Sequence, residues 1–234
     1  MKEASKSFPK GSYKLVCPFI PSCLQIFLKH CKGSKDMYSV LTRNNVIPTG
    51  QLKWVKILGE QNLNWKKIFR LPFAVTKNSK LQWLQYRINH CIIATNQYLV
   101  KIKLTDDPLC TFCKSDNESI EHLFWNCNTV QDFLQDVDNW FLSGGISLPM
   151  NKLNFLFGDL SKIFPNNPYN MIFLYIKQYV YNSRCFKKNL SLQAIIIKLK
   201  DMYKLESMIA VKNKKITEFD NVWNVFEKLL LNTS

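Results

Sequence analysis

Residues 110–127 read CTFCKSDNESIEHLFWNC and hold three of the chain's eight cysteines and one of its three histidines. The spacing is C-x2-C-x8-H-x4-C, and its four groups are Cys110, Cys113, His122 and Cys127. A two-residue gap lets two thiolates of one turn face the same ion, and the second pair completes the tetrahedron that zinc prefers. Because four such ligands leave no open coordination position, we expect one structural zinc ion.

The residues between the ligands predict how the chain presents them. Ser119 can cap a short helix that carries His122 in its first turn. His122 and Cys127 are five residues apart, about 140° around an α-helix, so they would not share one face. We therefore expect the helix to end near Asn126 and Cys127 to lie at the junction with the next helix.

Other roles for the cysteines are less compatible with the sequence. A redox Cys-x-x-Cys motif belongs beside a βαβ pattern, which this chain does not have. The retroviral nucleocapsid knuckle has four residues, not eight, in its middle gap. The cysteines outside the cluster are expected only to pack; they are Cys17, Cys23, Cys31, Cys91 and Cys185.

Charge and hydropathy indicate the class of partner. The 234 residues carry a formal net charge of +15, which favours a polyanionic partner, with RNA or DNA first. A biased genome could also produce such a lysine-rich composition. The apolar segment 15–28 contains two prolines and falls short of the ~20 residues of a membrane span, and it has no cleavage site. We expect a cytoplasmic or nuclear protein with no membrane partner and no small-molecule substrate.

Apolar residues recur at helical spacing along most of the chain, so the predicted fold is mainly α, a helical domain with a small zinc site in a loop and a short helix. Residues 1–50 contain several prolines and glycines, and we predict an irregular basic segment there. Residues 51–145 are predicted to form the zinc-binding domain, and residues 146–234 a C-terminal helical region. The predicted helices cover 22–30, 80–101, a segment that follows Thr129 and ends at Gly144, and then 168–188, 191–211 and 217–231.

Residues 81–127 resemble the zinc-binding domain that follows the reverse transcriptase in LINE-type (non-LTR) retrotransposons. That family joins a helix bearing Q-Y-R-x-x-H to a Cys-x-x-Cys pair and then to E-[ST]-x-x-H-[LIM]-[FL]-W-x-C. The matching residues here are Gln85-Tyr86-Arg87 with His90, Cys110 with Cys113, and Glu118-Ser119 through His122-Leu123-Phe124-Trp125 to Cys127.

The resemblance implies the C-terminal part of a polyprotein whose upstream endonuclease and polymerase copy element RNA into target DNA. In that setting the zinc segment and its helices would help to hold template RNA or target DNA. The sequence contains neither upstream enzyme, and its one acidic pair, Asp106-Asp107, precedes a proline like a turn rather than a polymerase metal site. We therefore expect a truncated copy without catalysis of its own.

Candidate nucleic-acid contacts lie on two predicted helices. Lys177, Tyr181, Arg184 and Lys188 stand at i, i+4, i+7 and i+11, which places three cations and a stacking ring on one face. That face could equally be a solvated one.

Two further candidates, Arg87 and His90, share the polar side of the earlier helix, where a histidine packed in the core is also a common outcome.

The alternative function is a zinc-stapled interaction or scaffold module. Exposure of Lys177, Arg184 and Lys188 would favour nucleic acid, and their burial under Trp140 and Trp223 would favour the scaffold.

Overall fold

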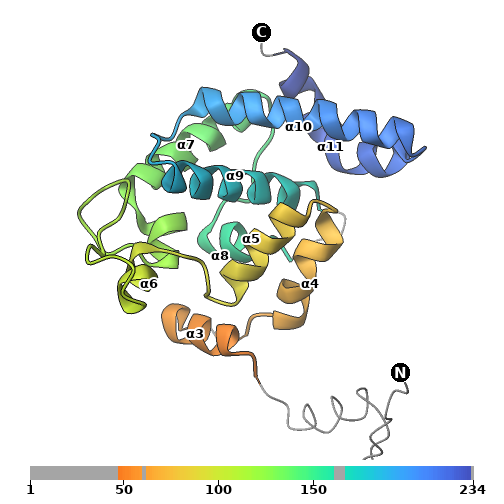
Figure 1. Ribbon diagram of the computed structural model, residues 1–234. Helices are drawn as coiled ribbons and strands as arrows, with labels where there is room; N and C mark the ends of the chain where they lie inside the picture. Colours follow the sequence, from red (N-terminus) through yellow and green to blue (C-terminus); the bar gives the residue numbers. More distant parts are fainter. Residues whose placement is uncertain (1–46, 60–61, 161–166, 233–234) are drawn as a thin grey trace, which may run out of the picture. The chain divides into compact units, whose positions relative to one another are not determined.

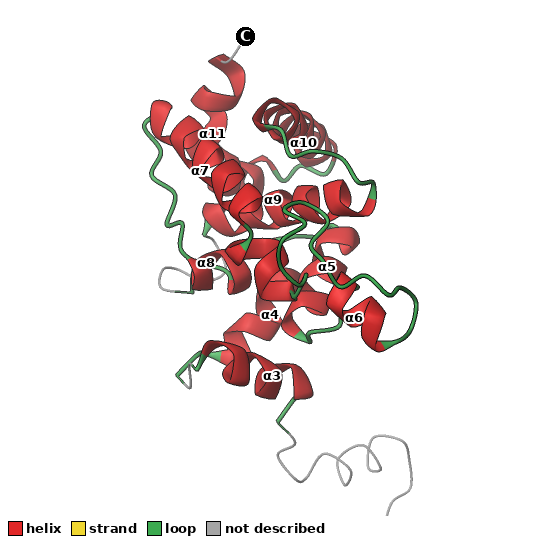
Figure 2. Ribbon diagram, turned by 90° about the vertical axis from the view of Figure 1, so that its left-hand side faces the viewer, coloured by secondary structure: helices red, strands yellow, loops and turns green. Residues whose placement is uncertain are grey.

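Helices make up nearly all the regular structure of this protein. The structure, a computed structural model, describes residues 47–59, 62–160 and 167–232. Within these ranges no strand forms, and the one β-bridge joins Leu109 to Asn117 (Figure 2). The mainly α prediction is confirmed. The helices are α3 Thr49–Leu58, α4 Trp65–Val75, α5 Ser79–Asn89, α6 Asn96–Lys101, the π-helix η1 His122–Asn126, α7 Asn128–Ser143, α8 Lys152–Phe157, α9 Pro168–Cys185, α10 Leu192–Lys212 and α11 Ile216–Asn232.

The C-terminal helices begin and end within three residues of the predicted bounds. Asn167 caps α9 by accepting from the backbone N–H of Tyr169, and Ser191 caps α10 in the same way through Ala194. The helix α7 begins at Asn128, directly after Cys127, and its apolar stripe from Val130 to Phe141 is buried. Apolar periodicity was sufficient to place these helices, and α7 begins without a side-chain hydrogen bond at its N-cap.

The prediction of one helix over 80–101 is wrong, because the chain breaks between α5 and α6. Cys91 adopts a left-handed backbone with φ 51°, and Thr95 then caps α6. The break is where α3 crosses: a Cβ on Gly50 would lie 2.5 Å from the backbone oxygen of Asn89 and the Cα of His90. Close approach of a second backbone therefore accompanies the end of α5, and no local pattern signals it.

The helix α4 shows how the fold compensates for a proline inside a helix. Pro72 has no N–H to give to the carbonyl of Ile68, four residues earlier. The side-chain amide of Asn89 on α5 donates to that carbonyl instead, at 3.1 Å, and both groups are buried. The pair fixes α4 against α5 and leaves no orphan carbonyl in the core.

A single hydrophobic core joins the zinc segment to the C-terminal helices. The helix α9 lies at its centre, with every residue from Met171 to Lys177 buried, and it contacts α5, α10 and α11 (Figure 1). The short helix α8 adds Phe155, Leu156 and Phe157 to the same core and touches η1. Residues from Pro48 onward form one compact unit, and the predicted boundary at 145/146 stays a prediction.

Some expectations fall outside the described residues. These are the helix at 22–30, the irregular character of residues 1–46, and the packing of Cys17, Cys23 and Cys31. In the part of the chain that the structure describes, no helix combines the length and the apolar character that a membrane crossing requires.

Candidate zinc centre

The four predicted ligands converge on one point. Their ligand atoms all lie within 4.8 Å of one another. The sulfurs of Cys110 and Cys127 are 3.8 Å apart, and the Cys113 sulfur is 3.3 Å from Nε2 of His122. Tetrahedral zinc, with bonds of about 2.3 Å to sulfur and about 2.0 Å to nitrogen, places its ligand atoms about 3.5–3.8 Å apart. The two sulfurs 3.8 Å apart are too distant for a disulfide bond, which is about 2.05 Å long. The donor atoms and their spacing therefore fit a zinc ion.

A tight turn presents the first two cysteines. The backbone N–H of Cys110 donates to Asp116 at 2.7 Å, and that of Lys114 donates back to Cys110 at 3.1 Å. Lys114 closes the turn with φ 59°, a left-handed conformation that is uncommon for a non-glycine residue. The turn brings Cys113 back over Cys110, as the two-residue gap predicts.

The second pair comes from a π-helix. Ser119 caps the helical residues 120–121 that lead into it, since its hydroxyl accepts from the N–H of His122 at 3.0 Å, and Cys127 follows the helix in an extended conformation. The expected cap, helix end and junction are confirmed. The assumption that His122 and Cys127 could not share one face of the helix is wrong, because this helix is not an α-helix. The N–H of Cys127 donates to the carbonyl of His122, five residues earlier, at 2.9 Å. That π-turn aligns two residues that an α-helix would separate by about 140°.

Two of the buried thiols share a hydrogen bond that separates their pKa values. The thiol of Cys110 donates to Cys127, which lowers the pKa of Cys127 to about 5 and raises that of Cys110 above its usual range. Burial adds to the increase at Cys110. A lowered pKa at Cys127 favours the thiolate, the form that binds metal.

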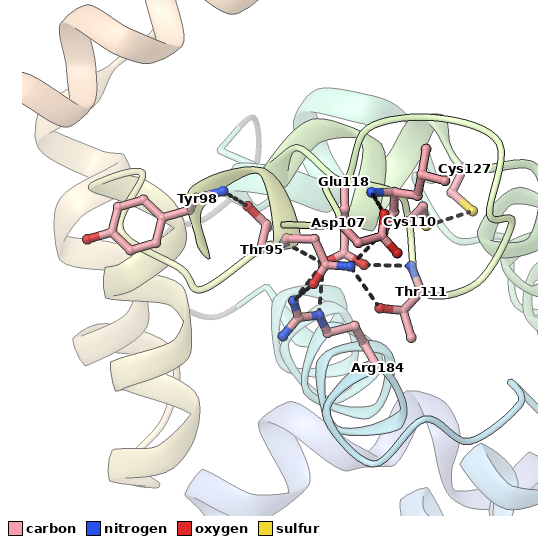
Figure 3. Close-up of polar contacts among 10 residues, drawn as sticks. Thr95, Tyr98, Asp107, Cys110, Thr111, Glu118, Cys127 and Arg184 are labelled. Carbon is pink, nitrogen blue, oxygen red and sulfur yellow. Dashed lines mark hydrogen bonds and ion pairs between the residues drawn. The ribbon is translucent and has the colours of Figure 1, made fainter. Parts of the chain in front are cut away.

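A buried carboxylate supports the ligand turn from behind (Figure 3). Glu118 is fully buried, and its Oε2 accepts from the backbone N–H of Thr111, between the two turn cysteines, at 2.8 Å. Its Oε1 accepts from the backbone N–H of Asn96 at 2.9 Å. Arg184 of α9 completes the site: its Nε donates to Oε1 at 2.8 Å, and its Nη2 forms an ion pair with the same oxygen at 2.8 Å.

The same guanidinium also fixes the start of α6. Its Nη2 donates to Oδ1 of Asn96 at 2.6 Å, and the Asn96 amide donates onward to the carbonyl of Leu109 at 2.6 Å, beside the first ligand. Arg184 therefore connects α9 to both ends of the ligand turn. The family motif includes Glu118, but no local pattern links Arg184 to the zinc segment.

The expectation of an exposed cationic face on α9 is wrong for two of its residues. Lys177 is 1% exposed; its ammonium donates to Oε1 of Gln85 and to the carbonyl of Leu156, and burial lowers its pKa to about 7. Arg184 is 9% exposed and paired with Glu118. Helical spacing correctly put both on one face, but residues of α5, α8 and the zinc loop cover that face. Trp140 and Trp223, whose cover would have favoured the scaffold, are not these partners.

The other four candidates differ in exposure, and whether they contact nucleic acid stays a prediction. Lys188 is exposed, whereas Arg87, His90 and Tyr181 are half-buried. The Arg87 guanidinium lies 5.3 Å from the centre of the Tyr181 ring, which fixes α5 against α9. His90 lies against two aromatic rings, and burial lowers its pKa.

A cleft lined by lysines lies beside the ligand turn, and the sequence did not predict it. Lys114 of the turn and Lys187 and Lys188, which follow α9, line a hollow of about 360 Å³. Thr111, Phe112, Thr129, Asn189 and Leu190 complete this lysine cleft. Lys114 and Lys187 both have left-handed backbones, with φ of 59° and 51°.

Two smaller expectations have opposite outcomes. Asp107 forms the anticipated turn, since its Oδ1 accepts from the N–H of Leu109 at 2.9 Å. Cys91 is buried and packs, but Cys185 is exposed at the end of α9, so the packing role predicted for it is wrong.

Comparison with known proteins agrees with the chemistry of the site. Residues 34–133 match the family described as zinc-binding in reverse transcriptase, a range that includes all four ligands and Glu118 but is less than half of the chain. No curated protein matches the chain. The matched range begins and ends earlier than the predicted domain at 51–145. A match to a zinc-binding family, together with the cluster of three cysteines and one histidine, identifies the metal of this site as zinc.

Proposed function

We propose that this chain, whose residues 34–133 form a zinc-binding domain of the reverse-transcriptase type, is a nucleic-acid-binding part of a LINE-type retrotransposon polyprotein, without catalysis of its own. Three thiolates as zinc ligands are compatible with a reducing compartment, and we place the protein in the cytoplasm or nucleus.

The zinc ion would be structural. Four protein ligands leave it no open position for water or substrate, and its binding free energy would contribute directly to folding. Its ligands come from the turn after α6 and from η1, so the ion would hold these segments together beside α7 and α8.

The lysine cleft is the observation that supports nucleic-acid binding. It gathers Lys114, Lys187 and Lys188 around one hollow, and its lining also includes the polar residues Thr111, Thr129 and Asn189. Ammonium groups with hydroxyl and amide donors suit phosphate oxygens, and they impose no base sequence. The net charge of +15 would add long-range attraction.

The test is binding of a fluorescein-labelled 20-nucleotide single-stranded RNA to the zinc-loaded chain, measured by anisotropy. With at least three phosphate contacts, affinity should fall at least about 20-fold between 50 and 200 mM KCl, because bound counterions are released. Lys188→Gln should weaken binding and make the salt slope shallower by about 0.7, whereas Lys56→Gln, at an exposed lysine of α3, should do neither. Affinity that does not change with salt would contradict the proposal.

A scaffold role is the second candidate, and two observations favour it. Lys177 and Arg184 are buried, and α10 leaves large apolar side chains in solvent, with Met208 71% and Val211 61% exposed. Such exposed residues are typical of protein contacts when they gather in a patch. The scaffold role would be favoured over nucleic-acid binding if the zinc-loaded chain bound no RNA even at 50 mM KCl.

A further inference from the structure

A row of aromatic rings connects α4 to α5. The His90 ring lies 4.3 Å from that of Tyr86 and 5.0 Å from that of Phe69, centre to centre. The Trp83 ring continues the row 5.3 Å from Tyr86, with the two planes only 6° apart. We call these four rings, together with Phe73 on α4, the aromatic seam.

Helical spacing explains why the seam faces outward. Trp83, Tyr86 and His90 stand at i, i+3 and i+7 of α5, while the stripe Leu81, Leu84 and Ile88 enters the core. Phe69 and Phe73 stand one turn apart on α4, which packs against α5. Trp83 is 57% exposed and Phe73 54% exposed, so the outer end of the seam adds little to the core.

That outer end forms an open hollow of about 510 Å³. Its walls are Phe73, Trp83 and Tyr86, and its margin includes Ser79, Lys80 and Gln82. The volume lies in the range of small-ligand sites, about 300–1,000 Å³. A flat aromatic group such as a nucleobase could lie against the exposed Trp83 ring and extend the stack.

Cations flank the rings on both helices. Lys66 and Arg70 are exposed and stand at i and i+4 of α4 in line with Phe73 at i+7. On α5, exposed Lys80 stands one turn before Trp83 and borders the hollow. Stacking rings interleaved with exposed cations suit a strand whose bases are unpaired and whose phosphates run alongside. An apolar protein segment would gain nothing from these charges.

We propose that the aromatic seam stacks unpaired bases of a single-stranded nucleic acid, with Trp83 as the outer platform and Lys66, Arg70 and Lys80 along its backbone. This inference rests on the proposed nucleic-acid-binding function and adds a specificity that the lysine cleft lacks. Phosphate contacts alone do not require unpaired bases, but stacking on Trp83 does.

The experiment compares 5′-fluorescein U12 RNA with a blunt 20-base-pair RNA duplex on the zinc-loaded full chain. Trp83→Ala should weaken U12 binding about 5- to 150-fold, the range measured for loss of one base–aromatic stack. It should leave duplex binding unchanged, and also the salt slope for U12, because no charge is lost. Trp83→Phe should recover most of the affinity, and Tyr98→Ala, a control at an exposed ring of α6, should bind as the unaltered chain does.

The possible failures are distinguishable. If the unaltered chain binds neither RNA, the proposed function itself is refuted, and the seam proposal with it. If the chain binds U12 and Trp83→Ala binds it equally well, the seam proposal is overturned while the function stands; a seam that contacts protein would give this result. Zinc content and circular dichroism of Trp83→Ala should equal those of the unaltered chain, because the side chain is more than half exposed.

Discussion

Replacing Arg184 with methionine tests whether α9 stabilises the zinc segment. The substitution keeps most of the side-chain volume and removes the guanidinium, which pairs with Glu118 through one hydrogen bond and an ion pair and donates once to Asn96. The Glu118 carboxylate, which is fully buried, would keep only the backbone N–H groups of Asn96 and Thr111. A buried charge would thus lose its partner, and solvent could not replace it.

The expected cost follows from burial. Removing one partner of a buried ion pair costs about 3–5 kcal/mol. Since two N–H groups would still bond to the carboxylate, we expect the lower end, about 3 kcal/mol, against the 5–15 kcal/mol that holds a typical domain together. Because Glu118 also positions the backbone between Cys110 and Cys113, zinc affinity should fall about 10- to 100-fold.

Two measurements check these magnitudes. Urea unfolding with zinc in excess gives the free energy of unfolding, and competition with a chromogenic chelator gives the zinc affinity. Lys188→Met is the matched control: it removes an exposed cation four residues further along the chain and should change stability by no more than about 0.5 kcal/mol.

A second substitution covers the case in which Arg184→Met does not fold. Adding Glu118→Gln removes the stranded charge, so the double variant should fold even where Arg184→Met does not. If both single variants fold, the double variant should lose at least about 1 kcal/mol less stability than the two single variants lose together. If Arg184→Met unfolds within about 0.5 kcal/mol of the unaltered chain and binds zinc equally well, the supporting role of Arg184 is refuted.

Three further predictions concern the metal, a buried lysine and a glycine. Cys113→Ser should lose stoichiometric zinc, seen by elemental analysis, and with it cooperative unfolding, since structural zinc contributes about 10–16 kcal/mol in zinc fingers. Burial lowers the pKa of Lys177 to about 7, against about 10.4 in the unfolded chain. Between these pH values the unfolded chain binds one more proton than the folded chain, so the free energy of unfolding should rise with pH by up to about 1.4 kcal/mol per pH unit. Lys177→Met should remove this contribution to the pH dependence, measured by urea unfolding at pH 6, 7.5 and 9. Gly50→Ala should lower the melting temperature, since its Cβ would meet backbone atoms at 2.5 Å.

Each of these predictions has an outcome that contradicts it. A Cys113→Ser protein that stays folded without metal would remove the structural role of the site. An unchanged pH slope in Lys177→Met would mean that the ammonium is not held in a low-dielectric site. A Gly50→Ala variant as stable as the unaltered chain would show that α3 does not approach the end of α5 as closely as described.

Signals that the chain carries locally were sufficient for much of this protein. The zinc ligands follow from spacing, because a metal site in one turn and one helix uses residues close in sequence. The helices α7, α9, α10 and α11 follow from apolar periodicity. The caps of α9 and α10, Asn167 and Ser191, were seen in the structure. The missed helices α3, α4 and α8 are short or interrupted by proline, so their patterns are weak.

By itself the sequence determined that the chain is mainly helical and identified the four members of the candidate zinc site, Cys110, Cys113, His122 and Cys127. Only the tertiary structure decided what covers each helix face. Spacing put Lys177 and Arg184 on one side of α9, but their partners Gln85 and Glu118 lie 92 and 66 residues away in the chain. Apolar periodicity shows which residues share a helix face, whereas burial and pairing depend on contacts between segments that are distant in the sequence. Because of such contacts, Lys177 and Arg184, which we expected at the surface, are buried and bonded to residues of other segments.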